Sequence, residues 1–360
     1  MERNSVSYRG CLLGLAVGDA MGYSVDKKTW EEICRDYGPN GLLGYDLANG
    51  SADVTSYTQI AAFLCNGLLL GTTRGNPTLY QRYMALAMQE WSKSQQFRTT
   101  PDKTACWVAQ VPGLRRRLCM DTRMLDALSR DTLGTPEKPV LISATAGALT
   151  AGIAVGLCYD PDKIDPPLVG ILGTQAVAFT HGDPETFLCG AFLAYAIAGI
   201  LQDPEAPLPE HFAHAMDVLT GQFSQQYPQT EALCSKVRYA LSLTREAEIT
   251  PLAAMTLLQC TTAAECLAGA VYASAIHAGN FDEAMIASVN HSGRSAAVGA
   301  VVGAILGARL GADALPEFYV ESLEVAPVLE ELANDLAEGR QASRIFDDSW
   351  DQKYVQGLPV

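Results

Sequence analysis

The side chains of this sequence that are best suited to chemistry gather in short polar segments between apolar runs. The most polar of them, residues 290–295, stands directly before a run of Ala, Val and Gly that is predicted to form a helix. Backbone N–H groups at a helix N-terminus form a natural anion-binding site. We therefore expect ligand contacts from Asn290, His291, Ser292, Gly293, Arg294 and Ser295.

Three further residues are candidates for a catalytic acid or base: Asp19, Asp53 and His181. Each also has a structural interpretation, which we favour. A buried Asp19 would hydrogen-bond a neighbouring loop, and Asp53 would cap the helix that follows it. His181 would be a buried histidine in a turn. For His291 two interpretations stay open, because it would either contact a ligand or lie exposed in its loop.

Two segments with glycine at every fourth position are predicted to hold these residues in place. The glycines are Gly10, Gly14, Gly18 and Gly22 near the start, and Gly299, Gly303, Gly307 and Gly311 late in the chain. Residues four apart share one face of a helix, and a glycine inside a helix costs about 0.5–1 kcal/mol relative to alanine. We therefore predict that the two helices pack backbone to backbone. The alternative is two independent helices that each use glycine.

Helical periodicity dominates the rest of the chain, and strand signals are scarce. We predict an all-α fold with one many-helix domain over residues 1–360. Helices are expected over residues 29–37, 55–70, 78–95, 122–130, 143–157, 166–180, 183–201, 209–225, 230–244, 251–259, 263–278, 281–289 and 326–337. Residues 38–50 and 96–140 are predicted to be mainly loops, and the tail 347–360 is expected to pack through Trp350 and Tyr354.

Composition excludes several classes of protein. Of 360 residues 48% are hydrophobic, and the net charge is −15, which disfavours nucleic acid as a partner. The basic run 115–117 is expected to be solvated. The ten cysteines form no C-x-x-C pair and have no zinc spacing, so they are predicted to be buried thiols in a reducing compartment. The apolar runs 187–201 and 296–308 are too short to span a membrane. We predict a cytoplasmic protein with no membrane contact.

Four segments, in order, resemble the ADP-ribosylglycohydrolase family. They are GCLLGLAVGDAMG at 10–22, VTSYTQIA at 54–61, THGDPE at 180–185 and NHSGRSAAVGAVVGAILGA at 290–308. The second stands where the family has Thr-Asp-Asp-Thr, and the last where it has Gly-Asp-Ser-Asp-Thr before a small-residue helix. The resemblance implies hydrolysis of the bond between ADP-ribose and an acceptor such as arginine. It also implies a pair of Mg²⁺ ions, which require oxygen ligands.

The sequence departs from this pattern at the positions that would hold the metal ions. Thr55, Ser56 and Tyr57 stand where the family has Thr, Asp and Asp. Arg294, Ser295, Ala296 and Ala297 stand where it has Asp, Ser, Asp and Thr. In the small-residue helix, Ala151, or Thr150 in a shifted register, replaces a frequent Arg. The resemblance therefore implies that the Mg²⁺ pair is lost and that no metal is bound.

Two interpretations of the altered positions remain. In the first, Arg294 attracts a phosphate or carboxylate and Tyr57 stacks on a ring, so that Thr55, Ser56 and Tyr57 line a rebuilt ligand site. In the second, Tyr57 and Arg294 plug a dead cleft. The loop with Ser143 and Gly147 corresponds to one that helps hold the diphosphate in the family, so ADP-ribose or a related nucleotide is the expected ligand.

Three hypotheses about function follow. The first is a degenerate member that lacks the metal pair and the usual hydrolysis but binds ADP-ribose, a related nucleotide or a protein partner. The second is a hydrolase that uses a metal-independent route through Asp19, Asp53 or His181. The third is a structural or partner-binding protein, like the lens crystallins that resemble this family.

Overall fold

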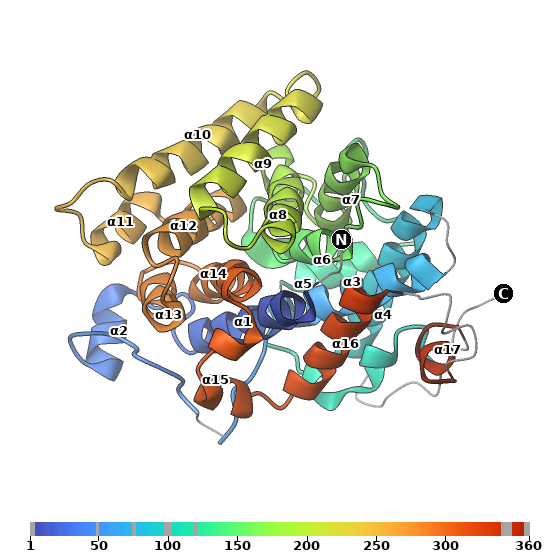
Figure 1. The fold of residues 1–360 in the computed structure, drawn as a ribbon, viewed down its shortest axis with the longest axis horizontal. Helices are drawn as coiled ribbons and strands as arrows, with labels where there is room; N and C mark the ends of the chain where they lie inside the picture. Colours follow the sequence, from blue (N-terminus) through green and yellow to red (C-terminus); the bar gives the residue numbers. More distant parts are fainter. Residues whose placement is uncertain are drawn as a thin grey trace.

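The computed structural model describes residues 4–47, 50–73, 77–96, 103–118, 121–339 and 348–355. These residues form an all-α fold, with an isolated bridge between Thr145 and Thr262 as the only β-pairing in the described ranges. One hydrophobic core extends from Tyr8 to Tyr354, so the two ends of the chain belong to the same unit. The predicted all-α, single-domain fold is confirmed (Figure 1).

The described residues up to Gln202 form eight α-helices. They are α1 (Ser5–Tyr23), α2 (Trp30–Tyr37), α3 (Ser56–Thr73), α4 (Tyr80–Gln96), α5 (Thr122–Leu128), α6 (Ala151–Cys158), α7 (Pro166–Ala178) and α8 (Pro184–Gln202). The described residues after Gln202 form nine more. They are α9 (Leu208–Phe223), α10 (Gln229–Leu243), α11 (Pro251–Leu258), α12 (Ala263–Ile276), α13 (Phe281–Val289), α14 (Ser295–Leu310), α15 (Glu317–Glu321), α16 (Ala326–Glu338) and α17 (Asp348–Tyr354).

Helices α1 and α14 lie against each other at the centre of the molecule (Figure 1). Their glycines interlock: a Cβ added to Gly14 would lie 2.1 Å from the carbonyl oxygen of Gly303, and one added to Gly18 would lie 1.9 Å from that of Gly299. The predicted backbone-to-backbone packing is confirmed. It brings the C-terminal end of α1 beside the N-terminal end of α14, where Gly22 faces Ser295.

Helix α8 is the one described helix long and apolar enough to cross a membrane, yet 83% of its apolar window is buried inside the fold. It packs against α6 and α7 through further close contacts, because a Cβ on Gly190 would lie 2.3 Å from the carbonyl oxygen of Gly173. Helix α8 is therefore a core helix of this domain.

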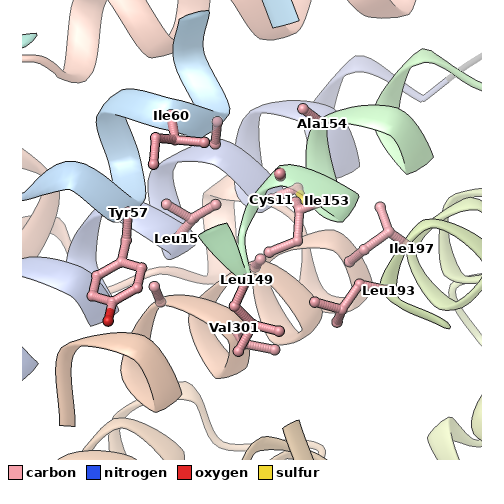
Figure 2. Close-up of a cluster of buried hydrophobic side chains, with 14 of the residues drawn as sticks. Cys11, Leu15, Tyr57, Ile60, Leu149, Ile153, Ala154, Leu193, Ile197 and Val301 are labelled. Atoms are coloured by element: carbon pink, nitrogen blue, oxygen red, sulfur yellow. The ribbon is translucent and has the colours of Figure 1, made fainter. Parts of the chain in front are cut away.

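The interior beside the central helices is apolar and joins several elements (Figure 2). Leu15 of α1, Ile60 of α3, Leu149 and Ile153 near α6, and Val301 of α14 form one cluster, and each is 1% exposed or less. Tyr57 belongs to the same cluster and is fully buried. Its ring therefore occupies interior volume near the start of α3.

The helix predicted over 143–157 is wrong at its start, because Thr145 pairs with Thr262, and the helix α6 begins only at Ala151 after a short 3-10 turn. The predicted packing of the tail is confirmed: Trp350 is 1% exposed and its Nε1–H donates to Thr73 Oγ1 at 3.1 Å. Residues 48–49, 97–102 and 119–120 of the predicted loops, which include Cys119, and residues 347 and 356–360 of the predicted tail lie outside the described ranges.

Candidate functional site

Asp19 fastens helix α1 to the start of α3. Its carboxylate is fully buried and accepts four hydrogen bonds, from the backbone N–H and hydroxyl of Thr55 (2.8 and 2.6 Å) and of Thr58 (3.1 and 2.6 Å). Burial raises the pKa of Asp19 to about 6, although the four hydrogen bonds act in the opposite direction. The donors are Thr55, directly before α3, and Thr58 in its first turn, so a carboxylate from α1 caps the N-terminus of α3.

Asp53 does not cap α3, so this structural prediction is wrong. The helix begins at Ser56, and the Asp53 carboxylate forms an ion pair with Arg116. Arg116 also pairs with Glu324, which joins three segments distant in sequence at the surface. The basic run 115–117 thus contributes one of its side chains to a structural ion pair.

Ser56 and Tyr57, the first residues of α3, turn away from solvent. Ser56 is 1% exposed, and its backbone N–H donates to the carbonyl of Leu118 at 3.3 Å. The Tyr57 carbonyl accepts a hydrogen bond from Thr150 Oγ1 at 2.7 Å, which ties α3 to the small-residue segment before α6. These two residues stand where the resemblance expects aspartates, and neither is open to a ligand from solvent.

Arg294 and Tyr57 meet directly. The guanidinium Nη2 of Arg294 donates to the Tyr57 hydroxyl at 3.1 Å, and its Nε lies 3.3 Å from Asp26 Oδ2. The Asp26 side chain is 4% exposed and that of Arg294 is 18% exposed. Positions 57 and 294, which the resemblance assigns to metal-binding aspartates, are therefore joined by a hydrogen bond, and one of them carries a cationic side chain.

The N-terminus of α14 already carries an anion. Asp26 Oδ1 accepts the backbone N–H of Ala296 at 3.3 Å, at the first turn of the helix. A carboxylate at this end of a helix is favoured by the helix dipole and by the unpaired N–H groups. Asp26 thus occupies the kind of site that we predicted for an anionic ligand.

Sequence reasoning missed Asp26. It lies in the turn after α1, four residues beyond the last glycine of the stripe, and nothing in its neighbours distinguishes it from a surface acid. The usable signal was its distance from Gly22. Once the two glycine stripes are paired, Gly22 faces Ser295, and the turn after α1 must then pass the start of α14.

Polar groups of the 290–295 loop bond it to the segments around it. The Asn290 side-chain amide donates to the Leu42 carbonyl and accepts the Leu42 N–H, each at 2.8 Å. Ser292 Oγ accepts the Trp30 N–H at 2.8 Å, and the Gly293 carbonyl accepts the Lys27 N–H at 3.1 Å. At the end of the loop, Ser295 Oγ donates to the Val289 carbonyl at 2.8 Å. These groups connect the loop to the segments that surround it.

His291 lies inside the loop, so the interpretation of an exposed histidine is wrong. It is 1% exposed; Nε2 donates to the Ser288 carbonyl at 3.0 Å and Nδ1 accepts the Gly293 N–H at 3.0 Å. Because a carbonyl only accepts and a backbone N–H only donates, these partners select the neutral ring with its proton on Nε2. Burial lowers the pKa of His291 to about 4.

The strained segment before α12 fixes the backbone of Arg294. Gln259 and Cys260 have φ values of 62° and 54°, in the left-handed region that side chains rarely adopt. This conformation directs the Cys260 carbonyl to the backbone N–H of Arg294 at 2.8 Å, and the Cys266 thiol donates to the same oxygen at 3.3 Å. Strained residues of this kind persist where the surrounding structure holds them in place.

His181 lies in a separate network with the loop of Ser143 and Gly147. Its ring nitrogens are each 2.9 Å from a hydroxyl, Nδ1 from Thr180 Oγ1 and Nε2 from Thr145 Oγ1, which in turn is 3.0 Å from Ser143 Oγ. A Cβ on Gly147 would lie 3.3 Å from the His181 ring. Burial lowers the pKa of His181 to about 4, so the ring is neutral at pH 7.

The three acid–base candidates therefore belong to different hydrogen-bond networks. Asp19 serves the start of α3, Asp53 pairs with Arg116, and His181 is held between two threonines. Within the described ranges, no three His, Cys, Asp or Glu side chains come together as a set of metal ligands. The residues at the implied Mg²⁺ positions do not fit a divalent cation, because a guanidinium lies among them and hard cations need several oxygen ligands.

Comparisons with known proteins agree with this arrangement of helices. A sequence model of the family described as ADP-ribosylglycohydrolase matches residues 3–345. Among solved structures, the chain is similar to an "ADP-ribosylglycohydrolase-related protein complex", with 23% identity, a TM-score of 0.55, and coverage of 94% of this chain and 99% of that one. No curated protein matches the sequence.

The fold is thus the all-α fold seen in ADP-ribosylglycohydrolase-related proteins. Because the family match extends over nearly the whole sequence, this chain belongs to the ADP-ribosylglycohydrolase family.

Proposed function

We propose that this chain is a member of its family that does not carry out metal-dependent hydrolysis and acts by binding. One observation carries the proposal: Arg294 donates to the Tyr57 hydroxyl at 3.1 Å, so two positions expected to hold metal ligands are joined by a hydrogen bond. The guanidinium keeps its positive charge at any working pH and repels Mg²⁺. Ala296 and Ala297, at two more of these positions, offer no side-chain oxygen.

The pairing of Arg294 favours the plugged cleft over a rebuilt phosphate site. Its guanidinium already faces the Asp26 carboxylate, which is 4% exposed, and that carboxylate also meets the start of α14. A phosphate would have to compete with this internal anion. The arrangement therefore supports a structural ion pair more strongly than a ligand-binding arginine.

The test of this proposal is a hydrolysis assay. A peptide ADP-ribosylated on arginine is incubated with the protein, with Mg²⁺ or with EDTA, and released ADP-ribose is measured. We expect no release above the protein-free control in either condition. Release that requires Mg²⁺ would overturn the proposal.

A metal-independent hydrolase remains the alternative, but the geometry supports it less. Asp19 is fully buried with four hydrogen-bond donors, and His181 is enclosed between Thr145 and Thr180. Release of ADP-ribose that persists in EDTA and is lost in His181→Gln would favour this alternative instead.

ADP-ribose or a related nucleotide is the first ligand to test. The loop at 143–147 supports this choice, because Ala144 is exposed and Thr145 is partly exposed beside His181. Calorimetric titration with ADP-ribose in EDTA should give saturable binding that weakens in Thr145→Val, which keeps the shape and removes the hydroxyl. Absence of binding would direct the search to a protein partner, with nucleic acid disfavoured by the net charge of −15.

The cysteines support a cytoplasmic location within this proposal. The nine cysteines in the described ranges are all free thiols, and eight of them are buried. Free buried thiols are typical of proteins from a reducing compartment.

A further inference from the structure

A cavity of about 290 Å³ lies where α2, α11 and α13 meet. These helices gather at one end of the molecule, on the left of Figure 1. Its lining residues are Trp30, Asn40, Pro251, Leu252, His277, Glu283, Ile286, Ala287 and Asn290. None of the proposals above uses this cavity, although Asn290 also belongs to the 290–295 loop.

The walls of the cavity are mainly apolar and are held in place. Trp30 is the first residue of α2, and its backbone N–H is fixed by Ser292 Oγ at 2.8 Å. A capping box between Thr29 and Glu32 secures the same turn. Ile286 is on α13, which is capped by Asn280. The indole and the aliphatic side chains thus form a preformed surface for an apolar group.

The polar groups of the cavity favour a cation. Glu283 is the one acid among the lining residues, none of which is Lys or Arg. His277 Nδ1 lies 3.2 Å from Glu283 Oε2, so a neutral ring that donates from Nδ1 leaves Nε2 as a second acceptor. The Asn290 amide is already used by Leu42 and Ile286. The one acid of the lining is therefore an acceptor, whereas the exposed Asn40 amide can both donate and accept, in a chain with net charge −15.

We propose that this cavity binds a small organic amine. The ammonium group pairs with the Glu283 carboxylate, and the apolar body of the ligand lies against the apolar surfaces of Trp30 and Ile286. The volume is close to the lower end of the range of about 300–1,000 Å³ for ligand pockets, which limits the ligand to a small molecule. The inference does not depend on the proposed function.

The test uses 2-phenylethylammonium chloride, titrated into the full chain by calorimetry, with 2-phenylethanol as the uncharged analogue. We expect saturable binding of the amine, and weaker binding of the alcohol. Glu283→Gln should weaken amine binding about three- to fivefold, as expected for an ion pair with an exposed carboxylate, and Glu283→Lys should weaken it more than tenfold.

Glu210→Gln is the matched control, because Glu210 is also an exposed acid in the first turn of a helix and does not line the cavity. It should leave amine binding unchanged. The proposal is overturned by absence of saturable amine binding, by equal binding of the amine and the alcohol, or by amine binding that is insensitive to both Glu283 variants. The comparison of the two ligands on the unaltered chain needs no variant to fold.

Discussion

The ion pair between Arg294 and Asp26 should make a measurable contribution to stability. Substitution of Arg294 by Ala removes the guanidinium from a carboxylate whose side chain is 4% exposed. At an N–O distance of 3.3 Å and an effective dielectric constant of about 20, the direct attraction is about 5 kcal/mol. Desolvation of both groups offsets much of this, so we expect a net coupling of about 1–3 kcal/mol.

A double-mutant cycle isolates this coupling from the other contacts. Arg294→Ala also removes the hydrogen bond to Tyr57, and Asp26→Ala also removes the one from the Ala296 N–H. Each of these hydrogen bonds is lost whether or not the other residue is also substituted, so its energy cancels when the coupling energy between Arg294 and Asp26 is calculated. The assay is urea unfolding of the parent, the two single variants and the double variant, which gives four unfolding free energies.

Arg238 and Glu231 provide the control pair. Their side chains are 51% and 69% exposed and form an ion pair on the surface of α10. The same cycle on this pair should give a coupling of at most about 0.5 kcal/mol. If the coupling of Arg294 and Asp26 were no larger than that of the surface pair, the central ion pair would have no structural role and the reasoning would be refuted.

Three further predictions concern the frame of the site. Asp19→Ala should lower the unfolding free energy by about 3–5 kcal/mol, because buried donors of Thr55 and Thr58 lose their acceptor; a urea midpoint unchanged from the parent would contradict this. His181→Gln should flatten the pH dependence of unfolding between pH 6.5 and 4. The pKa of His181 is lowered to about 4 in the folded chain, so the neutral ring contributes about 3 kcal/mol of stability above pH 6.5, and this is lost as the pH falls towards 4. Equal slopes of unfolding free energy against pH in the parent and the variant would refute this prediction. Gly14→Ala should lower the unfolding free energy by about 1–3 kcal/mol or more, since the new Cβ would lie 2.1 Å from a backbone oxygen. Gly221→Ala, whose new Cβ would have no atom within 4 Å, should raise it by up to about 1 kcal/mol. Equal shifts in melting temperature for the two variants would contradict the close packing of α1 on α14.

The central packing could be predicted from the sequence because glycine spacing is a local signal. Gly14 and Gly303 belong to stripes with a period of four, and a helix places such residues on one face. Because each glycine lowers helix stability, its presence indicated close packing against another backbone, and each end of the chain has one such glycine-rich helix face. The helices between them followed from periodicity, except that the helix predicted over 143–157 begins only at Ala151.

The candidate site was harder to predict because its partners are distant in sequence. The types of Tyr57 and Arg294 showed that aspartates were replaced, but not that the two side chains would meet. Asp26 was missed because a single acid in a turn has no distinctive neighbours, and its position depends on how α1 packs on α14. His291 was left open because loop composition does not reveal that the Ser288 carbonyl and the Gly293 N–H enclose its ring.

The most direct test of the account is a calorimetric titration of the unaltered chain with Mg²⁺. With Arg294 joined to Tyr57 and Asp26, we predict no saturable Mg²⁺ binding and no change in melting temperature when EDTA is added. Saturable binding of two Mg²⁺ ions per chain, together with a melting temperature lowered by EDTA, would show that an intact metal pair exists and would contradict the account.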